Sequence, residues 1–220
     1  MGMKIFKFYF SFVIILSFST LQVFAQNPTP SVPIEIMAGN KEVYSQFVLK
    51  RFFSPTSKFD FFGLATYKAN YKNEVEENRA IIISQFGYNF KKGFGIMAGL
   101  DFNSFAGFSP IVGPKHSFAS KNFLAVTNLS FFLNDGFDAK LFGLYEYHPP
   151  INSNWKFYSR LQFIHNFSIN YNEHNISYVY LRGGVQKNQF IFGLGVNFDW
   201  SGPDKVFNNN FGPFVRWEFD

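Results

Sequence analysis

Four histidines are the side chains of this sequence best suited to acid–base catalysis or metal binding: His116, His148, His165 and His174. A zinc site draws its ligands from short, fixed spacings and adds cysteine or carboxylate partners. The sequence has no cysteine, and successive histidines lie 32, 17 and 9 residues apart. We therefore predict no metal site and no cofactor.

A serine nucleophile would need one of these histidines as a general base within hydrogen-bonding reach. Two side chains of a regular β-strand share a face only when their positions differ by an even number. Ser117 directly follows His116. Ser177 lies three positions after His174. Both pairs would then point to opposite faces of a strand, and the spacing predicts that the chain is not an enzyme.

The elements that must carry these side chains are short strands. Phe, Tyr and Trp make up 22% of the residues, with 34 Phe, yet the mean hydropathy is only -0.04. Apolar residues must therefore be interleaved with polar ones, as in a strand with one buried face. Residues 190–200 alternate in this way, and so do 94–103 and 155–167. The glycines at 193 and 195 fit small inward positions beside large neighbours rather than a phosphate-binding loop.

The N-terminus has the features of a secretory signal peptide. Lys4 and Lys7 precede an apolar run over 8–18, and Ala25 ends a typical cleavage site. The run is shorter than the ~20 apolar residues of a spanning helix. We predict a cleaved signal peptide at 1–25, a short periplasmic linker at 26–32 and a β-barrel at 33–220. Without the two leader lysines, 18 Lys+Arg face 15 Asp+Glu, a net charge of +3 that indicates no nucleic-acid partner.

An exported chain of such strands can live in lipid by closing its sheet into a barrel, which satisfies every backbone group between strands. Turn residues divide the mature chain into twelve segments. They are Pro33–Asn40, Val43–Phe53, Phe59–Ala69, Arg79–Phe90, Gly93–Asn103, Phe108–Ala119, Asn122–Leu133, Phe137–Tyr147, Trp155–Phe167, Ile176–Gln186, Phe190–Trp200 and Asn210–Phe219.

The sixth segment decides the strand number. Pro110 and Pro114 cannot donate to a ladder, so this segment is the weakest. Bacterial barrels have even strand numbers, with both ends in the periplasm and longer loops outside. Twelve strands put the long links Ser201–Asn209 and Ser168–Asn175 outside. The pattern favours an all-β, antiparallel up-and-down transmembrane barrel of about twelve strands, with ten as the alternative.

The inward face of these strands is rich in polar and charged side chains of both signs. The candidates for lining the lumen are Gln85, Asp101, Lys140, Glu146, Arg160, Gln162, Arg182, Asp199, Arg216 and Glu218. Such charges either pair across the lumen and occlude it or line a water-filled path. A barrel of about twelve strands permits both. We favour the narrow or occluded lumen.

The outward face is apolar and ends in aromatic residues. Trp and Tyr near strand ends are typical of interfacial girdles, and here they are Trp155, Trp200, Trp217, Tyr88, Tyr145 and Tyr147. On the same pleat Leu194 faces lipid and Gly195 faces the lumen. Leu194→Arg is expected to cost about 2–4 kcal/mol at the bilayer midplane, and Gly195→Ser to be mild.

Three stretches resemble uncharacterised outer-membrane β-barrel proteins of Bacteroidota: 34–39 (IEIMAG), 193–199 (GLGVNFD) and 212–219 (GPFVRWEF). The last is also similar to the C-terminal strand by which the barrel assembly machinery recognises its substrates. That strand normally ends on an aromatic residue, whereas here Asp220 follows Phe219. The resemblance implies an outer-membrane location and no particular activity.

These observations lead to one expected function and two alternatives. We expect an integral outer-membrane barrel with a structural or small-solute channel role. A lipid-acting barrel enzyme would need His, Ser and an acid to converge at the outer rim. A surface receptor or adhesin would need long, ordered outer loops. The expected partners are outer-membrane lipids and the assembly machinery, and a small solute.

The leader gives the first testable prediction. We expect signal peptidase to cleave after Ala25, so that intact-mass measurement of the membrane-extracted protein finds Gln26 as its first residue. Retention of Lys4 and Lys7 in the mature protein would contradict export by this route.

Overall fold

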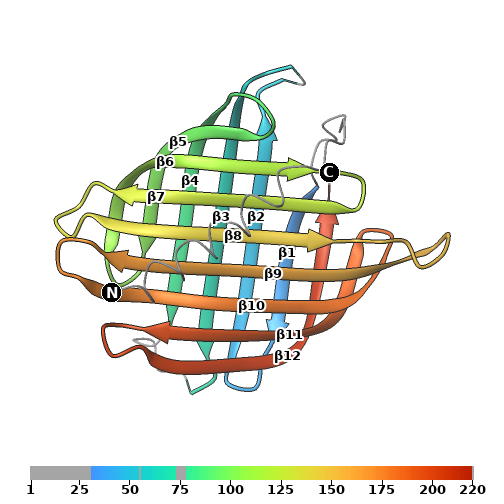
Figure 1. Cartoon of the computed structure of the whole chain (residues 1–220). Helices are drawn as coiled ribbons and strands as arrows, with labels where there is room; N and C mark the ends of the chain where they lie inside the picture. The colour runs from blue at the N-terminus through green and yellow to red at the C-terminus, as the bar shows by residue number, and fades with distance from the viewer. Residues whose placement is uncertain (1–30, 55, 73–77, 220) are drawn as a thin grey trace, which may run out of the picture.

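The apolar and polar residues that alternate along the sequence lie on the two faces of one closed sheet. The structure, a computed structural model, describes residues 31–54, 56–72 and 78–219. Within them twelve strands, each antiparallel to its neighbours, form a closed barrel (Figure 1). The strands are β1 (Val32–Ala38), β2 (Glu42–Phe52), β3 (Phe59–Asn70), β4 (Arg79–Asn89), β5 (Phe94–Asn103), β6 (Gly107–Ala119), β7 (Phe123–Phe132), β8 (Asp138–Tyr147), β9 (Trp155–Ser168), β10 (Glu173–Lys187), β11 (Phe190–Ser201) and β12 (Val206–Phe219).

The prediction of a twelve-stranded up-and-down barrel is confirmed, and the ten-stranded alternative is wrong. No helix in the described part of the chain is long and apolar enough to cross a membrane. The predicted signal peptide and most of the predicted linker lie outside the described residues. β1 begins at Val32, one position before the predicted start of the barrel.

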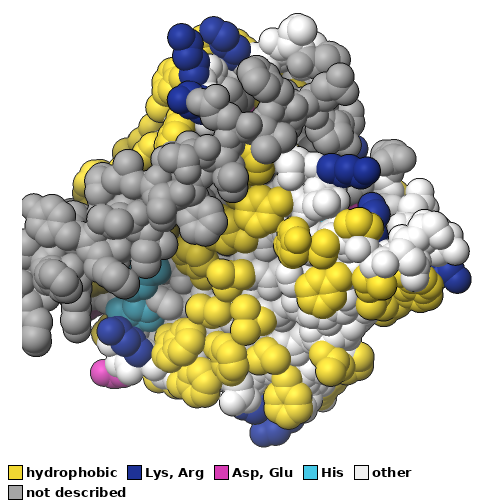
Figure 2. All heavy atoms as spheres, turned by 45° about the vertical axis from the view of Figure 1, so that its right-hand side comes forward, with side chains coloured by type: hydrophobic (Ala, Val, Ile, Leu, Met, Phe, Trp, Pro, Cys, Tyr) yellow, Lys and Arg dark blue, Asp and Glu magenta, His cyan; other side chains and the backbone are white. Residues whose placement is uncertain are grey.

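The period of two fixes which side chains face outward. In β11 Ile191 and Asn197 are fully buried, whereas Leu194 between them is 71% exposed. The same alternation places Ile96 and Leu100 of β5 outside and Asp101 inside. Hydrophobic side chains spread over the outer wall in Figure 2, and Lys and Arg side chains gather near its edges. An outer wall of this kind would be unstable in water, because it exposes far more contiguous apolar surface than soluble proteins do.

The barrel closes between its first and last strands. β1 pairs with β12 in a register that sets Ile36 opposite Val215 and Glu35 opposite Arg216. β1 also pairs with β2, so neither side of β1 is an open edge. Closure satisfies backbone groups that would otherwise meet hydrocarbon without a partner.

The proline-containing sixth segment is a full strand. Pro110 and Pro114 of β6 both point outward. The β5 side of β6 is paired throughout, and the β6–β7 pairing is interrupted at residues 113 and 114. Ile111 and Lys115 on either side keep the same register. The missing donor of Pro114 therefore interrupts the pairing locally and does not shift the register of the strand.

The links at the two ends differ from the expected lengths. At the end where β1 begins and β12 ends, which we call the end with the termini, they are 53–58, 90–93, 120–122, 148–154 and 188–189, and at the other end 39–41, 71–78, 104–106, 133–137, 169–172 and 202–205. The expected long outer loops at Ser168–Asn175 and Ser201–Asn209 are therefore wrong. Their Asn and Ser residues resemble loop signals, yet Asp199 pairs with Asn208 and Phe198 with Asn209 within the sheet.

A cysteine pair tests the closure. Ile36→Cys with Val215→Cys should form a disulfide, because directly opposed antiparallel residues have Cα atoms within disulfide range. Ile36→Cys with Phe211→Cys is the control, since Phe211 lies four positions, about 13 Å, along β12. Non-reducing electrophoresis of the refolded variants reads out both. Failure of the first pair while Val215→Cys cross-links to a cysteine in β2 would show that β1 is not part of the barrel.

Candidate functional site

The inner face of the barrel is the candidate functional site. The structure places every lumen candidate of the sequence on this face: Gln85, Asp101, Lys140, Glu146, Arg160, Gln162, Arg182, Asp199 and Arg216 are buried, and Glu218 is half-buried at the end of β12. Whether they line a path for a solute stays a prediction. Their contacts form clusters at different positions along the barrel axis.

The central cluster joins two arginines to one carboxylate. Arg160 of β9 donates to Glu35 Oε1 at 2.7 Å, and Arg182 of β10 donates to the same oxygen at 2.8 Å. All three side chains are at most 1% exposed. Glu35 Oε2, Arg160 Nε and Nη1 and Arg182 Nη2 have no hydrogen-bond partner among the described residues. The carboxylate of Glu35 therefore balances two guanidinium charges in a part of the lumen that solvent does not reach.

Aromatic side chains and a glycine hold Arg182 in the cluster. Its guanidinium lies 5.3 Å from the Tyr44 ring centroid and 5.7 Å from that of Phe214, within the range of cation–π contacts. A Cβ at Gly195 would lie 2.7 Å from Met37 Sδ and 2.8 Å from Arg182 Cδ. The predicted role of this glycine, to make room for large neighbours, agrees with this contact. A serine here would require the flexible side chains of Met37 and Arg182 to shift, and the expectation that Gly195→Ser is mild stays a prediction.

A second cluster lies toward the end with the termini. Arg216 of β12 donates to both carboxylate oxygens of Glu146 and, at 2.8 Å, to Glu218 Oε1. It also donates to the Tyr158 hydroxyl at 2.8 Å. His148, just beyond β8, lies 3.4 Å from Glu146 Oε2 through Nε2. Burial lowers the pKa of His148, but the hydrogen bond and charge of Glu146 outweigh burial and raise the pKa above its ordinary value.

This second cluster also contains a group of potential metal ligands. One ligand atom each from Glu146, His148 and Glu218 lie within 4.8 Å of one another. The Arg216 guanidinium already bonds both carboxylates, so a cation would have to displace a buried positive charge. The arrangement fits an ion-pair network better than a metal site.

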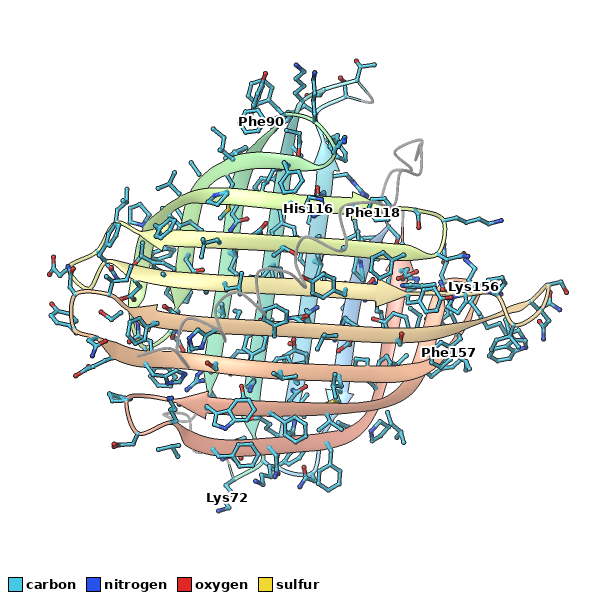
Figure 3. All side chains as sticks on the ribbon, viewed as in Figure 1. Lys72, Phe90, His116, Phe118, Lys156 and Phe157 are labelled. Atoms are coloured by element: carbon cyan, nitrogen blue, oxygen red, sulfur yellow. The ribbon has the colours of Figure 1, made fainter. Side chains whose placement is uncertain are left out.

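A cavity of about 220 Å³ opens beside this cluster at the end with the termini. Its wall includes Lys50, Lys156 and Gln186 and reaches Arg216 at its inner end. Lys156 and Phe157 lie together where β9 begins, and Lys72 lies at the opposite end of the barrel (Figure 3). We call this cavity the vestibule; Arg216 lines it, whereas Glu35, Arg160 and Arg182 of the central cluster do not.

Further ion pairs fill the rest of the lumen. Near the end away from the termini, Lys68 donates to Asp199 at 2.6 Å and lies 3.5 Å from Glu42 Oε1. Tyr180 donates to Asp199 at 2.8 Å. The other ion pairs of the described residues join Lys140 of β8 to Asp101 of β5, and both Lys115 of β6 and Lys50 of β2 to Asp60 of β3.

The sequence analysis missed several members of these clusters, above all Glu35, Asp60, Lys68 and Lys115. The signal for Glu35 was present, because it alternates with Ile34 and Ile36 in a segment recognised as a strand. Lys115 was missed because Pro114 made its strand ambiguous. The partnerships themselves join positions up to 147 residues apart, and no local pattern indicates them.

The histidines outside the lumen correct one sequence-based inference. His116 points outward and packs on Phe94 with ring centroids 4.5 Å apart, near Phe118 toward the end of β6 (Figure 3). His174 and Ser177 were expected on opposite faces. They lie on the same face, with His174 Nε2 2.8 Å from Ser177 Oγ. The register shift between His174 and Ile176 is the reason, because one extra residue reverses the alternation.

Comparison with known proteins gives distant structural likenesses only. No protein-family model matches the sequence, and no curated protein is significantly similar to it. The fold is similar to the KdgM porin, with a TM-score of 0.46 and 9% identity over 86% of this chain and 99% of that chain. For the NanC porin the values are 0.45, 11%, 86% and 98%. For LpxR from Salmonella typhimurium they are 0.40, 6%, 86% and 100%. These likenesses are too distant to indicate a function.

The central cluster predicts a large effect from one substitution. Glu35→Gln should lower the free energy of unfolding by about 3–5 kcal/mol, because it leaves two buried guanidinium groups without an anion. Glu173→Gln, the same change at an exposed position of β10, is the control. Urea titration of both variants in detergent measures the difference, and equal stabilities would show that Glu35 does not hold the cluster together.

Proposed function

We propose that this chain is an integral protein of the bacterial outer membrane with an occluded lumen. The outer wall supports the proposal, since exposed apolar residues such as Ile96 and Leu194 cover its middle. Predicted girdle residues sit at both ends of this wall. Trp155, Trp217, Tyr88, Tyr145 and Tyr147 belong to strand ends near the termini, and Trp200 to the other end. Lipid is the solvent that such a wall requires.

The proposed export route follows from the sequence. The signal peptide at 1–25 would carry the chain to the periplasm, and the alternating strand at 211–219 would be recognised by the barrel assembly machinery. Both termini and the 220 Å³ vestibule would then face the periplasm. An origin in Bacteroidota stays an inference from the three short sequence stretches.

The lumen would serve either as a structural core or as the resting state of a narrow channel. The observation that supports occlusion is the complete burial of Glu35, Arg160 and Arg182 midway along the barrel. A water-filled path would require at least one arginine to leave this cluster. Arg160 and Arg182 carry N–H donors without partners among the described residues. A negatively charged solute would bind there most favourably, because it would supply the missing acceptors.

Conductance in planar bilayers tests this function. The refolded protein should give no stable ion-carrying steps. The combined variant Glu35→Ser, Arg160→Ser and Arg182→Ser should give them, because it removes the anion and both cations of the central cluster together. Arg79→Ala is the control, since Arg79 lies at the rim and contacts Ser201. Steps of the same size from the unaltered protein would contradict an occluded lumen.

A further inference from the structure

A serine flanked by two histidines lies on the outer wall of the barrel, outside the lumen. Ser177 of β10 is paired directly with His165 of β9, and His165 Nδ1 lies 2.8 Å from Ser177 Oγ. His174 Nε2 lies 2.8 Å from the same oxygen. The ion-pair clusters do not use these three side chains, which lie near the end of the barrel away from the termini.

A β-bulge brings the histidine and the serine of β10 together. His174 pairs with Phe167, whereas Ile176 pairs with Asn166, so residue 175 is the extra residue. Phe167 and His165 both point outward from β9. Their partners His174 and Ser177 therefore point outward as well. Bulges commonly redirect a side chain in this manner next to functional sites.

The hydrogen bonds fix the roles of the two histidines. His174 Nδ1 lies 2.7 Å from the carbonyl oxygen of Gly202, which only accepts hydrogen bonds. The neutral imidazole of His174 therefore carries its proton on Nδ1 and presents the lone pair of Nε2 to the Ser177 hydroxyl. Ser177 donates to His174, and His165 then donates to Ser177. This is the geometry of a serine activated by a general base whose other nitrogen is oriented by a third group. The third group here is the Gly202 carbonyl, in the place where an acid was expected.

The surroundings of Ser177 suit an acyl chain. Ser177 pairs with Trp200 on its β11 side. Trp200 packs on Phe207 with ring centroids 5.4 Å apart, and Phe198 stacks on Phe207 at 6.1 Å. Phe207 is 50% exposed. This aromatic surface next to the serine would hold the apolar part of a substrate that arrives from the membrane.

We propose that Ser177 is the nucleophile and His174 the general base of a hydrolase that acts on acyl esters of membrane lipids. Ser177 Oγ bonds to the carbonyl carbon of the ester as its proton passes to His174 Nε2. The ester C–O bond breaks, the proton passes to the departing alcohol, and the acyl group stays on Ser177. His174 then takes a proton from water as the water oxygen bonds to the acyl carbon. The bond between the acyl carbon and Ser177 Oγ breaks, the proton passes from His174 to Ser177 Oγ, and the acyl group leaves as a fatty acid. Ester and water are consumed, and alcohol and acid are formed.

The position of the site defines the substrate class. Ser177 faces outward near the end that the proposed orientation places outside the cell, so it would meet the outer leaflet. A water-soluble ester would not benefit from the Trp200–Phe207 surface. We therefore assign the site to long-chain esters at the membrane surface. This inference goes beyond the proposed function, and the lumen can be occluded whether or not the site is active.

Hydrolysis by the refolded protein in detergent tests the assignment. The probes are p-nitrophenyl palmitate, p-nitrophenyl acetate and a diacyl phosphatidylethanolamine in mixed micelles. The protein should hydrolyse the long-chain ester and the phospholipid faster than the acetate. Ser177→Ala and His174→Gln should each lower kcat at least about 100-fold, the usual contribution of a nucleophile's base. Ser159→Ala is the matched control, because Ser159 is an outward serine near the other end of β9.

A covalent probe covers variants that fail to fold. A fluorophosphonate should label the unaltered protein at Ser177, located by mass spectrometry of the peptide, and Ser159 should stay unlabelled. No hydrolysis of any of the three esters together with no labelling at Ser177 would overturn the proposal. Unchanged hydrolysis by folded Ser177→Ala would overturn it as well.

Discussion

Backbone hydrogen bonding in hydrocarbon is the constraint on which this structure depends. A strand in contact with lipid cannot leave its N–H or C=O groups without hydrogen-bond partners. The sheet must therefore close, and β12 must pair with β1. Closure forces one face of every strand outward and the other into a confined lumen. The sequence suits both the lipid outside and the polar lumen inside, because Phe, Leu and Ile alternate with Gly, Asn and charged residues. Tight packing inside follows, as the close approach of Met37 and Arg182 to Gly195 shows.

The lumen charges are stable only as pairs, because the closed wall gives them little water. In six ion pairs of the described residues, both side chains are at most 10% exposed. Arg160 and Arg182 share Glu35, whereas Arg216 spans Glu146 and Glu218. The central cluster thus has two cations for one anion, and the cluster at the vestibule has two carboxylates for one arginine, although Arg216 Nε also has no hydrogen-bond partner among the described residues. The barrel is filled at its centre and has a cavity at one end.

Sequence alternation was sufficient to predict the strands, their faces and their number, since the period of two is a local property. It predicted the closing pair because an open edge in lipid is too costly. It could not predict which charges meet across the lumen, because Glu35 and Arg182 are joined by barrel geometry alone. It also failed at His174, where one bulged residue reverses the alternation. Bulges depend on local backbone geometry, and no glycine or proline in residues 173–177 indicates one.

Chemical labelling of single cysteines tests the central claim most directly, because the natural chain has none. The three positions are Gln162, which is fully buried in the lumen, Leu194 on the outer wall and Asn170 in an exposed turn. In proteoliposomes a charged maleimide should label Asn170→Cys and leave the other two unlabelled, and a lipid-soluble maleimide should label Leu194→Cys. Labelling of Gln162→Cys by the charged reagent as fast as Asn170→Cys would contradict a lumen closed by paired charges.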